Sequence, residues 1–269
     1  MNAIAFDHVS FAFDGADVLT DVSFELPKGS TRFLFGASGS GKSVLLKLAL
    51  GLLRPDAGTI SINGRRIDNL SERDLLDVRS DIGMAFQENA LFDSYTVNEN
   101  VGFRLYEQTS MPIEQVRRRV DEVLSFVGLG EYADRMPSEL SGGQRRRVGI
   151  ARAMTSRPSL MFFDDPTTGL DPLTSISVNN EIVKLRDLEH VTSIIATHQI
   201  RDAMYIATHI AEPGVPEPRI TTASDEQAPP ADFMVLFEGR VHFEGTRSEL
   251  LRSQDPYLKK LLYKTLPPW

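Results

Sequence analysis

A glycine-rich loop ending in lysine and serine is the first segment whose residue types suit phosphate chemistry. Residues 36–43, GASGSGKS, fit the pattern G-x-x-x-x-G-K-[ST] between the apolar run TRFLF and the helix-forming run VLLKLALGLL. Glycines let backbone N–H groups turn inward around a polyphosphate, and the helix N-terminus that follows adds partial positive charge. The alternative is a glycine-rich turn with a surface lysine. We predict a nucleotide site formed by Gly36, Ala37, Ser38, Gly39, Ser40, Gly41, Lys42 and Ser43.

Two adjacent carboxylates end a second apolar run, LMFF at residues 160–163. A strand of this kind is buried, so its acids emerge at the carboxyl edge of the sheet, where ligands of open α/β sheets bind. We expect Asp164 and the Ser43 hydroxyl to hold Mg²⁺, Lys42 to reach the β- and γ-phosphates, and Asp165 to orient or deprotonate the attacking water. The alternative is that the two acids only cap the turn after the strand.

Residues 140–144, LSGGQ, resemble the signature of the ABC ATPases. The resemblance implies that Ser141, Gly142, Gly143 and Gln144, at a helix N-terminus, face the ATP held by a second copy of the chain. ATP would then join the two subunits of a homodimer, and hydrolysis would release them. Three arginines follow at 145–147, and either they strengthen the field around the γ-phosphate or they form a solvated run.

Further motifs of the same family follow in order along the chain. Gln87, after the apolar run IGMAF, resembles the Q-loop glutamine that binds Mg²⁺ and senses the membrane partner. Asp171, in Gly-Leu-Asp, resembles the D-loop aspartate that crosses the dimer, and His198 resembles the switch histidine that contacts the γ-phosphate. Phe13 stands where the family stacks an aromatic ring on adenine, although a lone aromatic residue in a strand also suits a core position.

Asp165 departs from the family pattern, which has glutamate at that position. The shorter side chain holds its carboxylate further back, and a misplacement of about 1 Å can lower a rate about 100-fold. We therefore expect slow turnover, with an ATP-gated dimer clamp as the alternative to a transport motor.

The elements around these motifs predict an α/β fold: a P-loop, RecA-like core with an N-terminal antiparallel β subdomain and an inserted α-helical subdomain. Short β-rich runs occupy residues 4–35, a hairpin is expected around Asn63-Gly64, and apolar runs at 160–163 and 192–196 alternate with helices, as in a parallel sheet. One nucleotide-binding domain is expected over residues 1–269, divided into core segments 1–87 and 157–250, the helical subdomain 88–156, a flexible proline-rich insertion at 212–232, and a helical tail at 251–269.

The composition of the chain excludes several kinds of partner and site. The net charge of -8, from 29 Lys and Arg against 37 Asp and Glu, disfavours nucleic acid, and the lack of cysteine excludes disulfides and thiolate metal sites. No leader is apparent, and no run approaches the roughly 18 apolar residues of a membrane span. An ABC-type translation factor would need two cassettes and a basic linker. A chromosome or repair ATPase would place a long coiled coil where residues 44–139 stand here.

The stretch LFDSYTVNENVGFRL at residues 91–105 is similar to the corresponding stretch of Mla- and Mce-type lipid transport ATPases, as are the tail DPYLKKLL and MPSE before the signature. The resemblance implies a peripheral subunit on the cytoplasmic side of the inner membrane, with an MlaE-type permease docking near 88–105 and an Mce-domain protein in the complex. It also implies a lipid cargo, namely phospholipid. Asn98 and Arg104 depart from that pattern, and another ABC branch is the alternative.

Overall fold

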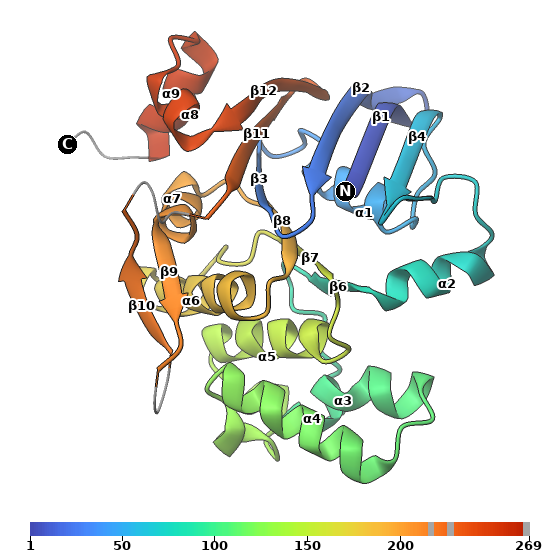
Figure 1. The fold of residues 1–269 in the computed structure, drawn as a ribbon, viewed down its shortest axis with the longest axis vertical. Coiled ribbons are helices and arrows are strands. Elements are labelled where there is room, and N and C mark those ends of the chain that lie inside the picture. The colour runs from blue at the N-terminus through green and yellow to red at the C-terminus, as the bar shows by residue number, and fades with distance from the viewer. Residues whose placement is uncertain (215–217, 225–228, 266–269) are drawn as a thin grey trace.

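The computed structural model describes residues 1–214, 218–224 and 229–265. Figure 1 shows the arrangement of its elements. The strands are β1 (Asn2–Phe13), β2 (Ala16–Pro27), β3 (Thr31–Phe35), β4 (Ala57–Ile62), β5 (Arg65–Arg66), β6 (Ile82–Ala85), β7 (Leu160–Asp164), β8 (Thr192–Ala196), β9 (His209–Glu212), β10 (Arg219–Thr222), β11 (Ala231–Phe237) and β12 (Arg240–Thr246). The helices are α1 (Lys42–Ala49), α2 (Glu72–Ser80), α3 (Val97–Gln108), α4 (Ile113–Phe126), α5 (Gly142–Met154), α6 (Pro172–Leu188), α7 (Ile200–Thr208), α8 (Arg247–Arg252) and α9 (Pro256–Thr265).

A six-stranded sheet with the order β12-β11-β3-β8-β7-β6 forms the centre of the molecule. All neighbouring pairs from β11 to β6 are parallel, and β12 joins β11 as an antiparallel edge strand. Because parallel neighbours end on the same side, the segments that follow β3, β6, β7 and β8 all leave the sheet at one edge. These are the segments that carry Lys42, Gln87, Asp165 and His198.

Both faces of this sheet are buried, and alternate residues of each strand belong to different cores. In β3, Phe33 and Phe35 join the cluster beneath the helices α3 to α7, whereas Leu34 joins the cluster beneath α1 and the antiparallel sheet. In β7, Phe163 and Phe162 divide in the same way. A strand covered on both faces needs apolar residues at every position, which explains the continuous apolar runs in the sequence.

The antiparallel sheet has the order β2-β1-β4-β5 and packs its apolar side on α1. The expected hairpin around Asn63-Gly64 is confirmed, since β4 and β5 pair across it. Asn63 has a φ of 50° and Gly64 a φ of 79°, the left-handed values that a tight two-residue turn of this type requires.

Helices α3, α4 and α5 gather at one end of the molecule, below the sheet in Figure 1. Helix α4 buries Val116, Val120, Val123 and Leu124 along a single stripe, and these residues join the same core as Val148 and Ile150 of α5. The stripe has the helical period, so this unit is held to the core by apolar packing rather than by its polar surface. Residues 88–156 remain our proposed limits for the helical subdomain.

The proline-rich stretch 212–232 was expected to be one flexible loop, but its described part contains β-strands. Residues Arg219–Thr222 form β10 and pair with β9, and β11 already begins at Ala231. A buried arginine on α6 fixes this ribbon: Arg186 donates to the carbonyls of Ile206 and His209, both at 2.6 Å, and Asp187 accepts from the Ala211 N–H at 2.8 Å. Residues 215–217 and 225–228 lie outside the described residues.

The tail contains the expected short helix, which extends over Pro256–Thr265. Leu258 is buried, and Tyr257, Leu261 and Leu262 pack against the core of the same chain. These residues therefore pack on their own body, and Trp269 lies outside the described residues.

Candidate functional site

The phosphate loop connects β3 to α1, and two of its glycines stand where a Cβ atom would clash with neighbouring atoms. A Cβ on Gly36 would stand 2.2 Å from Ser40 Oγ and 2.8 Å from the Leu236 carbonyl. A Cβ on Gly41 would stand 2.6 Å from Leu19 Cδ2, and Gly41 has a φ of 99°. Gly41 also caps α1 without any side-chain hydrogen bond to the first helical amides. Those amides are therefore left for an anion.

Lys42 lies inside this loop rather than on the surface, which excludes the surface-lysine alternative. It is 8% exposed, and its Nζ donates to the carbonyls of Gly36 at 2.8 Å and Ala37 at 3.2 Å. Burial lowers the pKa of Lys42, while Asp165 and Asp164 act in the opposite direction. The buried hydroxyl of Ser40 makes no hydrogen bond within the described part of the chain. A lysine and a hydroxyl lacking polar ligands beyond their own loop fit a phosphate group.

Ser43 and Asp164 meet across the site. Ser43 Oγ donates to Asp164 Oδ1 at 3.1 Å, joining the first turn of α1 to the end of β7. Burial raises the pKa of Asp164, and so does the neighbouring Asp165, against the opposing effects of Ser43 and Lys42. A hydroxyl beside a partly desolvated carboxylate is a pair of hard oxygen donors, which fits Mg²⁺.

Asp165 and His198 form a second polar pair next to the first. One oxygen of Asp165, Oδ1, lies 2.8 Å from His198 Nδ1 and accepts from the His198 backbone N–H at 3.2 Å. Asp165 has a φ of 46° and is fixed on both sides, because its N–H donates to the Ala196 carbonyl and its own carbonyl accepts from Thr168. The second oxygen, Oδ2, has no hydrogen bond in the described structure that would hold it back from a substrate.

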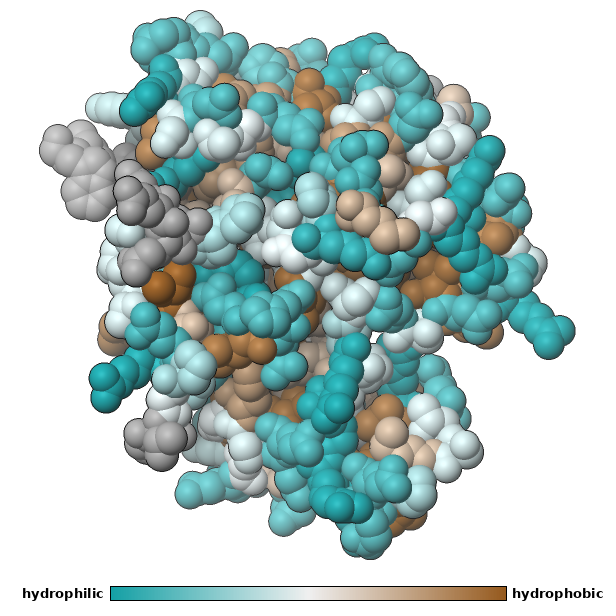
Figure 2. Space-filling model, in the orientation of Figure 1, coloured by the Kyte–Doolittle hydropathy of each residue, from teal (hydrophilic) through white to brown (hydrophobic). Residues whose placement is uncertain are grey.

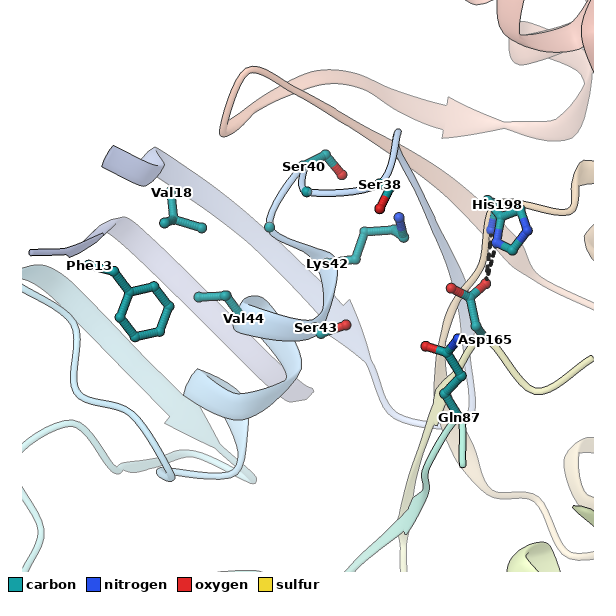
Figure 3. Close-up of a pocket in the computed structure, with 12 residues that line it drawn as sticks. Phe13, Val18, Ser38, Ser40, Lys42, Ser43, Val44, Gln87, Asp165 and His198 are labelled. Carbon is teal, nitrogen blue, oxygen red and sulfur yellow. Dashed lines mark hydrogen bonds and ion pairs between the residues drawn. The ribbon is translucent and has the colours of Figure 1, made fainter. Parts of the chain in front are cut away.

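Phe13, Gln87, Asp165 and His198 line one cavity of about 530 Å³ together with residues 38–44. Figure 3 shows Lys42 extending from the loop towards the side where Asp165 and His198 lie, with Phe13, Val18 and Val44 at the opposite end. Phe13 is 48% exposed and meets Phe11 edge to face, so the core position that we weighed for it is wrong. Its free face is available to a flat ring.

The signature residues are not part of this cavity. Ser141 caps α5: its Oγ accepts from the Gln144 N–H at 3.2 Å, and Gln144 Oε1 accepts from the Ser141 N–H at 2.8 Å. Gly142 and Gly143 begin the helix, and a Cβ on Gly143 would stand 2.1 Å from Thr174 Cγ2. Within one chain, this helix N-terminus therefore lies outside the cavity that the phosphate loop forms.

Asp171 caps α6 in this structure. Its Oδ1 accepts from the N–H groups of Leu173 and Thr174, both at 3.1 Å, and its Oδ2 accepts from the Thr174 hydroxyl. Bonding to Thr174, followed by the backbone bonds, lowers the pKa of Asp171. Thr174 is also the residue that covers Gly143, so the cap links the two helices.

The sequence did not identify Arg146 as a structural residue. It is 5% exposed and donates to the carbonyls of Phe86 at 3.0 Å and Thr168 at 3.2 Å, and also to the carbonyl of Gln87. Arg145 and Arg147 likewise bond to the carbonyls of Leu140 and Val127. The solvated run that we weighed for these arginines is therefore wrong. An effect on the field around the γ-phosphate stays a prediction, and Arg146 lies close enough to Asp165 for the two charges to interact. The sequence could have indicated the burial of Arg146 through its helical spacing from Gly143 and Ile150, which places all three residues on the buried face of α5.

Comparison with known proteins gives the same assignment as the motifs. The family model described as "ABC transporter" matches residues 19–168. The methionine import ATP-binding protein MetN of Carboxydothermus hydrogenoformans is 42% identical over 71% of this chain. The probable ribonucleotide transport ATP-binding protein mkl of Mycobacterium leprae is 32% identical over 97% of it. The chain spans 56% of the length of the first relative and 68% of the second.

Solved structures confirm the predicted fold class. CbiO1 of Clostridium perfringens, part of the ABC transporter complex cbiONQ, aligns with a TM-score of 0.79 at 26% identity, over 99% of this chain and 96% of its own. The dimeric ATP-binding cassette MJ0796, bound to ADP and Pi after hydrolysis, aligns with a TM-score of 0.74 at 27% identity, over 90% of this chain and 98% of its own.

We predict that Asp164→Asn stabilises the free protein at pH 7 while weakening its response to Mg²⁺ with ATP. A raised carboxyl pKa means that the folded state holds the proton more tightly than the unfolded state, so ionised Asp164 costs stability above that pKa. The gain in Tm should therefore shrink as the pH falls towards the ordinary aspartate range, and Mg²⁺ with ATP should raise the Tm of the parent more than that of the variant. Thermal unfolding measures both effects. The exposed Asp77→Asn is the control, and a variant less stable than its parent at pH 7 would contradict the prediction.

Proposed function

The chain belongs to the ABC transporter family, and from that premise we propose that it is the ATP-binding and ATP-hydrolysing subunit of a transporter, working as a homodimer on a membrane permease. The observation that carries the proposal is the single cavity that brings Gln87, Asp165 and His198 to the phosphate loop from three different strand ends. Convergence of a phosphate cradle, a carboxylate and a histidine is the arrangement that phosphoryl transfer to water needs.

Each group has a role that its position supports. Phe13 stacks on the adenine, Lys42 and the loop amides bind the β- and γ-phosphates, and His198 contacts the γ-phosphate. Ser43 and Asp164, with Gln87 nearby, would hold Mg²⁺, which neutralises phosphate charge when bound. The exchange of Lys42 from its two carbonyl partners to phosphate oxygens replaces neutral acceptors by charged ones, and so favours binding.

Asp165 is the proposed group that orients the attacking water and takes its proton. His198 holds one oxygen through two bonds, and this fixes the direction of the other oxygen, Oδ2. The backbone at this position is left-handed, and aspartate tolerates that conformation better than most residues do. The backbone therefore favours aspartate at position 165.

We predict that Asp165→Asn lowers the rate constant of ATP hydrolysis by about 10²- to 10⁴-fold, the usual contribution of a general base. Asp165→Glu should raise the rate, by up to about 100-fold, because it restores about 1 Å of reach. It should also lower the Tm, because glutamate fits the left-handed backbone less well. Multiple-turnover phosphate release and thermal unfolding are the measurements. A parent rate retained in Asp165→Asn would rule out Asp165 as the base and favour the clamp.

In the proposed dimer, ATP lies between the phosphate loop of one copy and Ser141, Gly142, Gly143 and Gln144 of the other, and Asp171 crosses between the subunits. Support comes from the signature residues, which lie outside the cavity of their own phosphate loop, and from the dimeric cassette MJ0796, which resembles this chain. Two half-sites that close only together make subunit association depend on the nucleotide.

A crosslink tests this arrangement, and the structure selects the position for it. Gly143 cannot carry a side chain without displacing Thr174, whereas a Cβ on Gly142 meets only Leu170 Cδ2, at 3.4 Å. The chain has no cysteine of its own. We predict that Ser38→Cys with Gly142→Cys, in the Asp165→Asn background, forms crosslinked dimers with a short thiol crosslinker only when Mg²⁺ and ATP are present. Either single cysteine variant is the control, and the same yield without nucleotide would contradict the sandwich.

For the cargo we propose a lipid of the phospholipid class, moved by an MlaE-type permease with an Mce-domain protein in the complex at the inner membrane. The similarity of residues 91–105 to that subgroup supports this proposal. The methionine import relatives match this chain as well as the mkl proteins do, so another branch of the family is the alternative. No helix in the described ranges has both the length and the apolarity that crossing a membrane requires.

Residues 88–105 are the proposed docking surface for the permease. Phe92, Tyr95 and Phe103 form an aromatic cluster with ring centroids 4.6 to 6.0 Å apart, and Phe92 and Tyr95 are 41% and 37% exposed. Figure 2 shows apolar patches on the surface of this end of the molecule. Asn100, fully buried, fixes the loop below the rings, because its amide bonds to the backbone of Phe92, Tyr95 and Thr96. Exposed rings on a braced loop suit protein recognition.

We predict that the tagged chain copurifies from its native membranes with an MlaE-type permease and phospholipid, and that Phe92→Ala with Tyr95→Ala loses at least 90% of the permease, roughly 1.4 kcal/mol or more of binding. Leu76→Ala, which removes an exposed leucine on α2, is the control. Protein and lipid mass spectrometry are the readouts. An amino-acid permease in place of the MlaE-type partner would overturn the cargo proposal and leave the ATPase proposal intact.

A further inference from the structure

Asn179 of α6 is a fully buried side chain without a hydrogen bond. It is 1% exposed, and neither its Oδ1 nor its Nδ2 has a partner among the described residues. A buried amide left in this condition costs free energy, so its presence in a packed interior needs an explanation. Its neighbour Asn180 provides a contrast, because Asn180 Oδ1 accepts from the Tyr205 hydroxyl at 2.7 Å.

A second cavity lies against Asn179. It has a volume of about 550 Å³ and is lined by residues of α6 and α7, which lie next to each other in Figure 1. This volume lies within the range of sites for small molecules. Most of its wall is apolar, with Leu170, Pro172, Ile176 and Met204 contributing, and the ring of Tyr205 forms one side. The site is distinct from the nucleotide cavity and shares no lining residue with it.

We propose that this cavity binds a small neutral molecule that has an apolar body and a carboxamide-type head group. An amide with both atoms unpaired needs one acceptor and one donor side by side, and another amide edge supplies them. The terminal torsion of an asparagine is soft, and Asn179 has no bond to break, so its side chain can turn towards the cavity at small cost.

Charge at the rim favours a neutral ligand over a charged one. Arg201 and Asp202 are adjacent and of opposite sign, and Asp202 already accepts from the Thr167 hydroxyl. The two buried polar residues of the lining, Ser175 and Asn179, are both neutral. An ion entering this site would lose its hydration without gaining a buried partner of opposite charge.

The cavity adjoins the two helix starts that follow the nucleotide site, so a ligand bound in it can influence that site. Helix α6 begins after Asp171, and α7 begins two residues after His198. Leu170 and Gln199, at these two junctions, both line the cavity. A molecule bound in this cavity therefore contacts the segment that carries Asp171 and the segment that carries His198.

Benzamide is the probe for the first test. We expect saturable shifts of the Asn179 side-chain amide signals in ¹H–¹⁵N spectra of the full chain without nucleotide, with a dissociation constant on the order of 1 mM for a ligand of this size. Toluene, benzoate and benzylamine are the matched controls and should each bind at least about tenfold more weakly. No saturation up to the solubility limit of benzamide, or equal binding of toluene, would overturn the proposal.

Two neighbouring variants provide the second test. Asn179→Leu keeps the branched shape and removes the unpaired amide, so it should raise the Tm by about 2–4 °C and abolish benzamide binding. Asn180→Leu breaks a hydrogen bond, so it should lower the Tm and retain binding. A Tm lowered in both variants would show that Asn179 has partners and would sink the idea. Loss of ATP-dependent dimers in Asn179→Leu, without benzamide binding to the parent, would instead assign the cavity to a second copy of the chain.

Discussion

Parallel pairing of β3, β8 and β7 is the constraint on which the site depends. The register places Leu34 beside Ala196, and Ala196 beside Asp164, so the phosphate loop, His198 and the two acids leave adjacent strands at one edge. Two further backbone bonds lock that edge, from Thr197 N–H to the Leu34 carbonyl and from Asp165 N–H to the Ala196 carbonyl. A shift of one residue along any of these strands would turn its buried residues to the other core and move the polar residue that follows the strand out of line with the others.

Charges that are partly removed from water accumulate at this edge. Burial lowers the pKa of Lys42 and raises that of Asp164, so each group is pushed towards its neutral form while the opposite charge nearby restores it. The folded chain carries this electrostatic cost before any nucleotide arrives. A triphosphate with its metal supplies negative charge to Lys42 and positive charge to Asp164 at the same time. One ligand can therefore stabilise the charged forms of both groups.

The sequence was sufficient for the parts whose local chemistry is self-contained. Apolar runs predicted the buried parallel strands, and glycine spacing predicted the phosphate loop, because both follow from local sterics and period. It was insufficient where a residue's partners come from distant segments. Arg146 bonds carbonyls from two other loops, and the β9–β10 ribbon depends on Arg186 and Asp187 of α6, which no nearby pattern announces. The left-handed backbone of Asp165 is imposed by its neighbours in the sheet, so the type of residue alone could not reveal it.

Helix α5 physically joins the proposed docking surface to the signature. Arg152 donates to the carbonyls of Asn89 and Ala90, and Arg146 donates to that of Phe86, so two turns of one helix hold the segment that contains Gln87. Arg146 also holds the Thr168 carbonyl, three residues after Asp165, and Gly143 packs on Thr174, which bonds to Asp171. A packed helix moves as a rigid unit, since its interior has little free volume for independent shifts. Displacement of residues 86–92 by a partner therefore cannot leave the signature turn unmoved unless these arginine bonds break. Breaking those of Arg146, which is 5% exposed, would leave buried polar groups unpaired.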